Sequence, residues 1–162
     1  MEIEELKGTS GEALLRFAID SEQLSEQFYR LVANRLKVPQ MQILFAEFAE
    51  QEELHRRTFE KLRPADLVLP AEAVLQDNLR LLHEYFRETL FNPHLLGEKL
   101  RRLSDPESAY NLAVSVELDS MIFYGELKPL MPPGERPVVE EIINQERSHF
   151  QRLLRIKQAR NY

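Results

Sequence analysis

The sequence predicts an all-α protein that folds as a single four-helix bundle over residues 1–162. Its 162 residues include only five glycines, and its nine prolines leave long segments free of helix breakers. Within those segments apolar residues recur at steps of three and four, the period of a helix that buries one face. The layout of the first two segments returns in the last two, as expected for two helical hairpins in a pseudo-two-fold relation.

The first hairpin is expected to contain helices at about 9–36 and 39–62. Thr9 to Glu12 fits a capping box, and Pro39 suits the first turn of the second helix. Pro64 marks the end of that second helix. The two core stripes are Leu15, Ala18, Glu22, Ser25, Tyr29, Val32 and Leu36, then Phe45, Phe48, Glu52, His55, Phe59 and Leu62.

The second hairpin is expected to contain helices at about 105–128 and 137–160. The stretch Ser104-Asp105-Pro106-Glu107 offers a cap, a first-turn proline and a first-turn acid. Prolines between positions 129 and 133 indicate the turn. The two core stripes are Tyr110, Ala113, Glu117, Ser120, Tyr124 and Leu127, then Val139, Ile142, Glu146, His149, Leu153 and Ile156.

Residues 64–104 are expected to form a long helical crossover between the hairpins. A connection of this length is typical when the second and third helices run parallel, since a short loop would make them antiparallel. An apolar stripe from Leu75 to Leu90 contains no carboxylate. The crossover is therefore expected to cover one side of the bundle or to form a subunit contact, and the exposed side of its stripe favours a homodimer.

The tetrapeptide Glu-x-x-His occurs once in the second helix and once in the fourth. Residues three apart share a helix face, so each motif directs one carboxylate and one imidazole the same way. A single such motif is commonly a surface pair, but that alternative does not explain two motifs with a matching upstream glutamate in each hairpin. The six side chains expected to meet inside the bundle are Glu22, Glu52, His55, Glu117, Glu146 and His149.

This set of side chains predicts a centre for two metal ions. Buried carboxylates need counter-charge, and no lysine or arginine lies on the four stripes near the glutamates. Two divalent cations would balance four carboxylates. Oxygen and imidazole ligands without thiolates suit iron or manganese, although zinc or cobalt fits the same set.

Four further residues repeat around the expected ligands. Tyr29 and Tyr124 lie two turns beyond a glutamate, so each hydroxyl is placed to reach a ligand carboxylate across the bundle, or else each ring is simply a core aromatic. Gln51 and Gln145 precede the two motifs. Each either accepts a hydrogen bond from an imidazole on a facing helix or is solvated.

Composition excludes several classes of function. The chain has 21 basic and 27 acidic residues and no basic cluster, which argues against a nucleic-acid partner. It has no cysteine, so disulfides, thiolate metal sites and cysteine nucleophiles are excluded. No apolar run approaches the roughly 20 residues of a membrane span. We expect a soluble cytoplasmic protein without a membrane partner.

These motifs resemble the ferritin-like di-iron superfamily, and most closely its rubrerythrin branch. The residues that carry the branch resemblance are Ala18-Ile19-Asp20-Ser21-Glu22 with Phe28-Tyr29, and Ala113 to Glu117 with Phe123-Tyr124. The resemblance implies two iron ions that react with hydrogen peroxide or dioxygen. It also implies that Glu52 and Glu146 bridge the metals, that Glu22 and Glu117 are terminal ligands, and that His55 and His149 each bind one metal.

The chain departs from the patterns of ferritin-like families at four points. Ser120 stands where a second glutamate of the third helix is usual. A rubredoxin domain needs four cysteines, so electrons are expected from a separate protein or a small reductant. Glu53 stands where a bacterioferritin carries its haem-ligating methionine, so no haem is expected. The few residues after His149 leave no room for the fifth helix of ferritin cages, which weakens a storage-shell hypothesis.

The leading functional hypothesis is a di-iron peroxide reductase or oxidase that protects against oxidative stress. One alternative is a ferroxidase that handles iron within a cage. Another is a di-iron oxygenase, which needs an apolar cavity beside the metals, with Phe45, Phe48 and Phe123 as candidate lining residues. The last is a non-enzymatic bundle in which the metal is structural and the crossover binds a partner.

Overall fold

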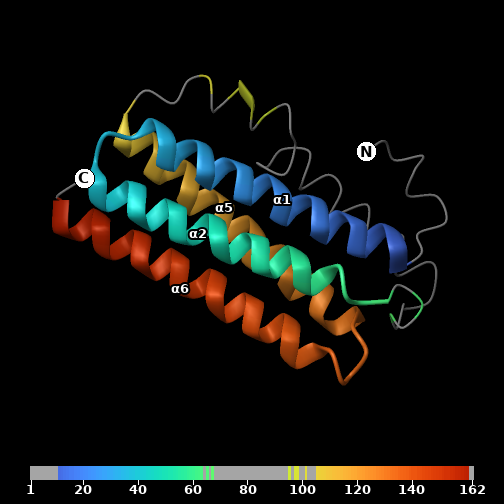
Figure 1. Ribbon diagram of the computed structural model, residues 1–162. Helices are drawn as coiled ribbons and strands as arrows, with labels where there is room; N and C mark the ends of the chain where they lie inside the picture. Colours follow the sequence, from blue (N-terminus) through green and yellow to red (C-terminus); the bar gives the residue numbers. More distant parts are fainter. Residues whose placement is uncertain are drawn as a thin grey trace.

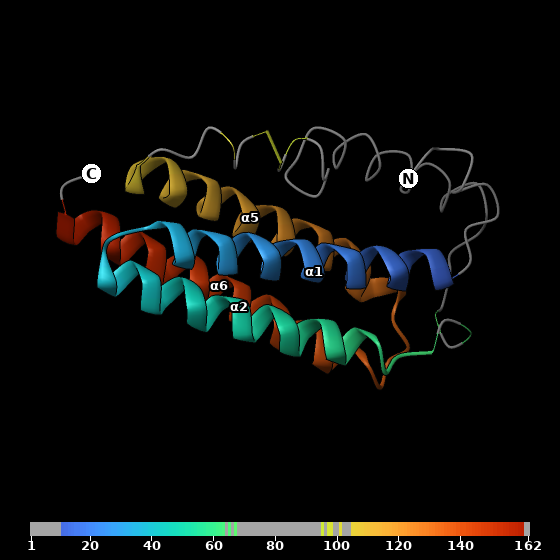
Figure 2. The same cartoon turned by 45° about the horizontal axis from the view of Figure 1, so that its top comes forward.

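The described part of the chain is a bundle of four long helices. The computed structural model describes residues 11–63, 65, 67, 95, 97–98, 101 and 105–160. The long helices are α1 (Gly11–Arg35), α2 (Pro39–Phe59), α5 (Pro106–Leu127) and α6 (Arg136–Arg160), and a short 3₁₀ helix, η3 (Lys128–Leu130), precedes α6. They lie side by side without a strand among these residues (Figures 1 and 2). The predicted all-α four-helix bundle is confirmed.

The helices form two antiparallel hairpins, α1 with α2 and α5 with α6 (Figure 1). A turn of three residues joins α1 to α2, and the Gln42 side chain closes it by donating to the Leu36 carbonyl over 2.7 Å. The Arg136 guanidinium closes the other turn on the carbonyls of Met131 and Pro129. Helices α2 and α5 run in the same direction in Figure 1, as a long crossover permits.

Two helix ends follow directly from local chemistry. Asp105 caps α5 by accepting from the Ser108 backbone N–H over 2.8 Å, and Pro106 occupies the first turn. Helix α2 ends at Phe59 rather than near residue 62 as predicted. The reason is a change of hydrogen-bond pattern, because the N–H groups of Lys61 and Leu62 bond three residues back instead of four.

Several predictions fall on residues outside the described ranges. They concern Thr9 of the capping box and almost all of the 64–104 crossover with its apolar stripe. The homodimer that the stripe favours stays a prediction. Leu67, one of the described positions, packs against the apolar core between the helices. No helix in the described ranges is long and apolar enough to cross a membrane.

The core consists of two apolar clusters with a polar layer between them. One cluster contains Phe28, Phe45 and Phe48, and the other contains Phe59 and Phe123. On every helix the polar residues fall between the two clusters in sequence order. The buried glutamates and histidines of that layer are Glu22, Glu52, His55, Glu117, Glu146 and His149. Apolar packing on both sides therefore keeps water away from the charged side chains.

Candidate metal centre

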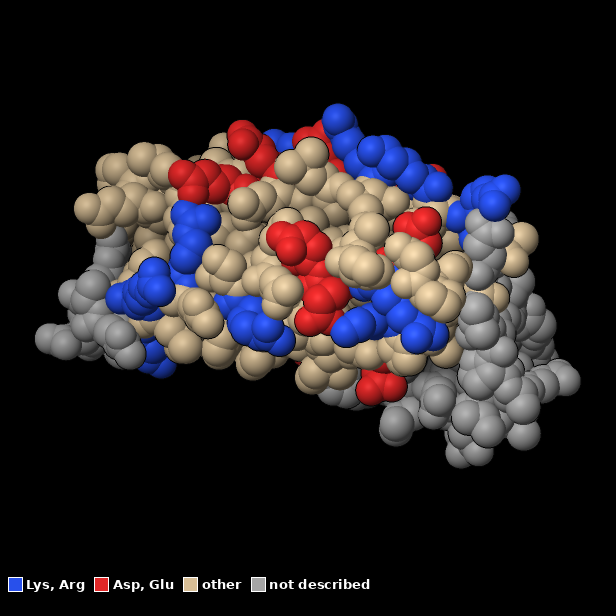
Figure 3. All heavy atoms as spheres, turned by 90° about the horizontal axis from the view of Figure 1, so that it is seen from below, with Lys and Arg blue, Asp and Glu red and all other residues tan. Residues whose placement is uncertain are grey.

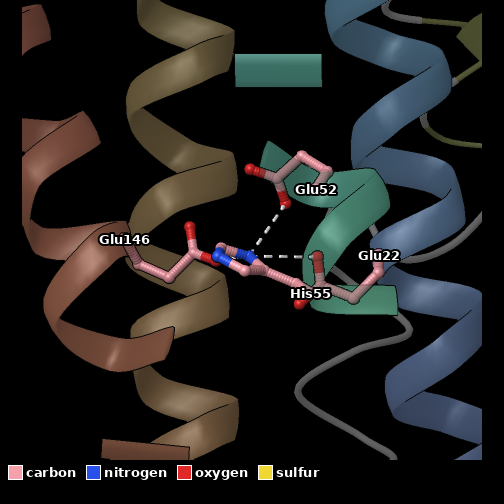
Figure 4. Close-up of side chains that lie close together, drawn as sticks. All are labelled: Glu22, Glu52, His55 and Glu146. Atoms are coloured by element: carbon pink, nitrogen blue, oxygen red, sulfur yellow. Dashed lines mark ion pairs between the residues drawn. The ribbon is translucent and has the colours of Figure 1, made fainter. Parts of the chain in front are cut away.

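All four helices contribute to the polar layer. Helices α1 and α5 each place one glutamate there, and α2 and α6 each place a glutamate and the histidine three residues later. None of the six side chains is more than 3% exposed. Figure 4 shows Glu22, Glu52 and Glu146 directed toward the His55 ring from three different helices. The structure thus brings together all six residues that the repeated motif predicts to meet inside the bundle.

The six side chains form two overlapping groups of candidate ligands. One group is Glu22, Glu52, His55 and Glu146, and the other is Glu52, Glu117, Glu146 and His149. Within each group one ligand atom per residue lies within 4.8 Å of all the others. Glu52 and Glu146 belong to both groups, which is the position a bridging carboxylate must occupy. The geometry agrees with the bridging roles that the family resemblance implies.

The ligand atoms themselves lack hydrogen-bond partners within the described residues. These buried atoms are Glu22 Oε2, both oxygens of Glu52, His55 Nδ1, Glu117 Oε2, Glu146 Oε1 and His149 Nδ1. Buried polar atoms are nearly always hydrogen-bonded, and leaving even one unsatisfied costs about 1–3 kcal/mol. Seven such atoms, oxygen and imidazole nitrogen only, facing one another at the bundle centre fit a pair of divalent cations.

Both imidazoles direct Nδ1 toward the carboxylates. His55 Nδ1 lies 2.9 Å from Glu146 Oε1 and 3.6 Å from Glu22 Oε2. The 2.9 Å contact is an ion-pair distance, but its geometry is not that of a hydrogen bond. His149 Nδ1 lies 3.3 Å from Glu117 Oε2 and 3.5 Å from an oxygen of Glu52. Nδ1 is therefore the nitrogen that each histidine offers to a metal.

Without metal, protons must balance the charge of these carboxylates. Burial is the main reason that the pKa of Glu52 lies well above its usual value, and the charges of Glu146 and Glu22 add to the shift. Burial and the charge of Glu146 likewise raise the pKa of Glu117 to about 8. A metal ion that binds here therefore displaces protons as it neutralises the carboxylates.

The pKa values of the two histidines and of Glu146 shift so as to favour the charged forms of these side chains. Burial by itself lowers the pKa of His149, but Glu117 and Glu146 outweigh it and raise that pKa to about 9. The pKa of His55 is also raised, because Glu22 and Glu146 overcome the opposing effect of burial. Burial disfavours the charged form of Glu146, yet the two imidazoles lower its pKa.

The tyrosines bond the terminal glutamates of the opposite hairpin. Tyr29 of α1 donates its hydroxyl proton to Glu117 Oε1 of α5, and Tyr124 of α5 donates to Glu22 Oε1 of α1. Both rings are fully buried. Burial and the adjacent carboxylate raise the pKa of each phenol well above its usual value, so both stay protonated donors. Each bond leaves the other glutamate oxygen free to face the centre.

The glutamines bond the imidazoles of the opposite hairpin in the same reciprocal manner. His55 Nε2 on α2 lies 2.7 Å from Gln145 Oε1 on α6, and His149 Nε2 on α6 contacts Gln51 Oε1 on α2. Both glutamines are only partly buried. All four outer hydrogen bonds therefore join one hairpin to the other, and each fixes the orientation of one candidate ligand.

The aromatic residues considered as lining for a substrate cavity pack against other rings. Phe45 and Phe48 contact Tyr29, with ring centroids 5.8 and 5.3 Å away. Phe123 contacts Phe17 at 4.8 Å. Ser120, at the position where a further glutamate is usual in rubrerythrins, is buried in α5.

Sequence reasoning passed over two outer glutamates. Glu47 and Glu141 each lie four residues before a repeated glutamine, which is one helical turn, so they extend the internal repeat. Gln145 donates to Glu141 over 3.1 Å, whereas Glu47 is paired with Arg152. The spacing alone contained the signal, because a carboxylate at i−4 of a glutamine is a typical helix-surface partner.

Comparison with known proteins identifies the family. The sequence matches the rubrerythrin family over residues 13–157. The chain belongs to the rubrerythrin family. It is also similar to a Thermotoga maritima protein, described as a candidate ferritin-like diiron-carboxylate protein, whose crystal structure was solved at 2.30 Å resolution. The TM-score is 0.64 at 26% identity, over 93% of this chain and 95% of that chain. A search of curated proteins finds no match.

Membership of the rubrerythrin family confirms the resemblance drawn from the repeated motifs. The match spans α2 and α5 and most of α1 and α6, so it includes every residue of the polar layer.

Proposed function

We propose that this rubrerythrin-family protein is a di-iron redox enzyme that reduces hydrogen peroxide or dioxygen. The observation that carries the proposal is the set of seven buried ligand atoms without hydrogen-bond partners in the described residues. Two bound iron ions would each supply one electron on passing from Fe(II) to Fe(III), and reduction of one hydrogen peroxide to two waters consumes two electrons and two protons. Manganese and zinc fit the same ligand set as substitutes.

The protein residues hold and shield the metals. Glu52 and Glu146 are assigned to both ions, and Glu22 with His55 and Glu117 with His149 complete the two ligand sets. The tyrosine hydroxyls and glutamine carbonyls restrain four of these ligands in their metal-facing orientation. The apolar clusters on either side exclude bulk water, which strengthens electrostatic interactions within the layer.

The proposal includes an external electron source and no haem. These 162 residues contain no cysteine for a rubredoxin-type iron site, and the proposed source of electrons that returns the metals to Fe(II) is a separate protein or a small reductant. Glu53 is directed to the bundle surface, where it pairs with Arg30 and Arg57. Its carboxylate is thus engaged away from the core, which supports a function without haem.

The test is anaerobic loading of the full chain with Fe(II), followed by hydrogen peroxide. We expect two irons per chain, a diferric absorption band and consumption of peroxide. The double variant Glu52→Ala with Glu146→Ala should lose all three. Glu50→Ala with Glu140→Ala is the matched control, because both residues lie on the outer surfaces of the same helices and should change nothing. A protein that binds two irons but neither forms the band nor consumes peroxide is not the enzyme proposed here.

The packing of the aromatic residues disfavours the oxygenase alternative. Phe45, Phe48 and Phe123 contact neighbouring rings at 4.1–6.3 Å between centroids, so each ring contributes to the packed core. An oxygenase for an organic substrate would need these side chains to line a space of substrate size. Substrate reduction by the metals alone requires only that a small oxidant reach the polar layer.

A further inference from the structure

Each imidazole bonds a glutamine in the same way. The two halves of the bundle differ in the charged side chains on the outer side of those glutamines. In both cases an amide carbonyl faces imidazole Nε2. A carbonyl oxygen only accepts, so Nε2 keeps its proton, and Nδ1 is the nitrogen whose lone pair a metal takes when it displaces the second proton. Up to this point the two halves of the bundle are equivalent.

Behind Gln145 stands a carboxylate. The Gln145 amide nitrogen lies 3.1 Å from Glu141 Oε1. A carboxylate cannot donate, so it must bond the NH₂ side of the amide, which leaves Oε1 for His55. No cation forms a salt bridge to Glu141 among the residues that the structure describes. The negative charge of Glu141 therefore polarises the chain from Gln145 to His55 and makes Nδ1 of His55 a stronger electron donor.

On the outer side of Gln51 the equivalent carboxylate forms a salt bridge with a cation. Glu47 occupies the position that matches Glu141, but it forms a salt bridge with Arg152. The Arg152 guanidinium also lies 5.0 Å from the centre of the Phe48 ring, and Phe48 stacks on His149 with ring centroids 4.1 Å apart. The Glu47 charge near Gln51 is thus balanced by Arg152, whereas the Glu141 charge near Gln145 has no salt-bridge partner among the described residues.

Both outer groups lie at the surface formed by α2 and α6. Figure 3 shows this side of the molecule, where acidic and basic side chains are interspersed. Glu141 is exposed, and the Arg152 side chain is 35% exposed. Water screens charges at such positions, so the difference between the two halves is modest in size.

We propose that the two metal positions are unequal, and that the position built around His55 binds a divalent cation more tightly than the position built around His149. This inference rests on the di-metal site of the proposed function but not on its reaction with peroxide. Binding of zinc alone tests it, without iron, oxidant or turnover.

The experiment is a titration of the metal-free full chain with Zn²⁺, followed by long-range ¹H–¹⁵N NMR of the imidazoles. The chain has four histidines, so the signals can be assigned from single substitutions. At one equivalent we expect the Nδ1 signal of His55 to move to a metal-bound position while that of His149 keeps its metal-free shift. The second equivalent should move His149. Nε2 of both rings should stay protonated throughout.

Two surface substitutions test the cause. Glu141→Gln removes the negative charge behind His55 and should lower the ratio of the two zinc affinities about two- to fivefold, the range for an exposed charge. Its matched control is Glu140→Gln, which removes the charge of the preceding residue. Glu140 forms a salt bridge with Lys128 and no hydrogen bond with Gln145. Arg152→Gln should lower the ratio by strengthening the His149 position, and Arg147→Gln, which removes a charge bonded to Asn144, should not.

The outcomes separate this inference from the proposed function. If both imidazoles respond together, or His149 responds first, the sites are not ordered as proposed although the di-metal centre stands. If Glu141→Gln leaves the affinity ratio equal to that of Glu140→Gln, the carboxylate behind Gln145 is not the cause. If the protein fails to bind two zinc ions and neither imidazole shifts, the metal centre of the proposed function is itself wrong.

Discussion

Tyr29 illustrates what a single residue adds to this centre. Its ring packs on Phe45 and Phe48, while its hydroxyl bonds Glu117 on a helix of the other hairpin. A phenol that stays protonated fixes one carboxylate oxygen as an acceptor and leaves the second for a metal. The ring and the hydroxyl thus serve packing and ligand orientation separately, and a substitution that removes only the hydroxyl can distinguish them.

We expect Tyr29→Phe to weaken metal binding about 10- to 100-fold, the usual range for loss of an outer partner of a ligand. The ring stays in place, so the stability of the metal-free protein should fall by no more than about 1–3 kcal/mol, the cost of leaving a Glu117 oxygen without its donor. Calorimetric titration with Zn²⁺ and urea unfolding measure the two effects.

Tyr110→Phe is the matched control for this prediction. Tyr110 is also buried in α5, but its hydroxyl has no hydrogen-bond partner among the described residues. Removing that hydroxyl should leave zinc affinity unchanged and should not destabilise the fold. Equal losses of affinity in the two variants would mean that core packing, and not the bond to Glu117, governs binding.

At the scale of the helices, local sequence predicted the bounds closely except at the end of α2. The Asp105 cap and the first-turn prolines Pro39 and Pro106 lie where the pattern predicted them, because caps and proline act through neighbouring backbone groups. The end of α2 at Phe59 was not predictable in this way. A switch of hydrogen bonding from four to three residues back depends on how the following chain leaves the bundle.

The Asp105 cap offers a prediction for an element as a whole. Its carboxylate accepts from the backbone N–H and from the hydroxyl of Ser108, at 2.8 and 2.9 Å. Asp105→Ala should lower the free energy of unfolding by about 0.5–2 kcal/mol, whereas Asp105→Asn, which keeps an acceptor, should lose far less. Urea unfolding of the metal-free proteins measures this. A similar loss in both variants would argue that the charge, rather than the cap, stabilises α5.

Helix periodicity also explains how much of the site was predictable. Spacing on one helix placed Glu52 with His55 and Glu146 with His149 on shared faces, so the structure brings together the nominated residues. The repeat also placed each tyrosine and glutamine within reach of a ligand across the bundle, but which partner each one bonds depends on the rotation and depth of each helix. That Tyr29 bonds Glu117 rather than Glu22, and that Arg152 takes Glu47, became visible only in the folded chain.

At the scale of the whole molecule, the polar layer opposes the folding of the metal-free chain. Four carboxylates and two imidazoles lie between apolar clusters, with at most 3% of any of these side chains exposed. Burial of charges without compensation is costly, and so is each unpaired ligand atom. The two aromatic clusters and the caps must therefore hold the bundle together until metal binds. Folding and metal binding are consequently linked in this architecture.

Metal binding should thus raise the free energy of unfolding. One isosteric substitution should separate the destabilisation by the polar layer in the metal-free protein from the stabilisation by bound metal. With Zn²⁺ at about 1,000 times its dissociation constant, a single site adds about 4.1 kcal/mol to the free energy of unfolding. Glu52→Gln keeps the shape of the residue shared by both ligand groups but removes one of four neighbouring carboxylates. In chelator this variant should be at least as stable as the wild-type protein, because the raised pKa of Glu52 means that folding must protonate this side chain, whereas a glutamine needs no proton. Added zinc should stabilise the variant far less. Thermal unfolding with chelator and with excess zinc measures both differences. A variant that is much less stable than wild type in chelator would mean that Glu52 supports the fold without metal, and the polar layer would then be structural in its own right.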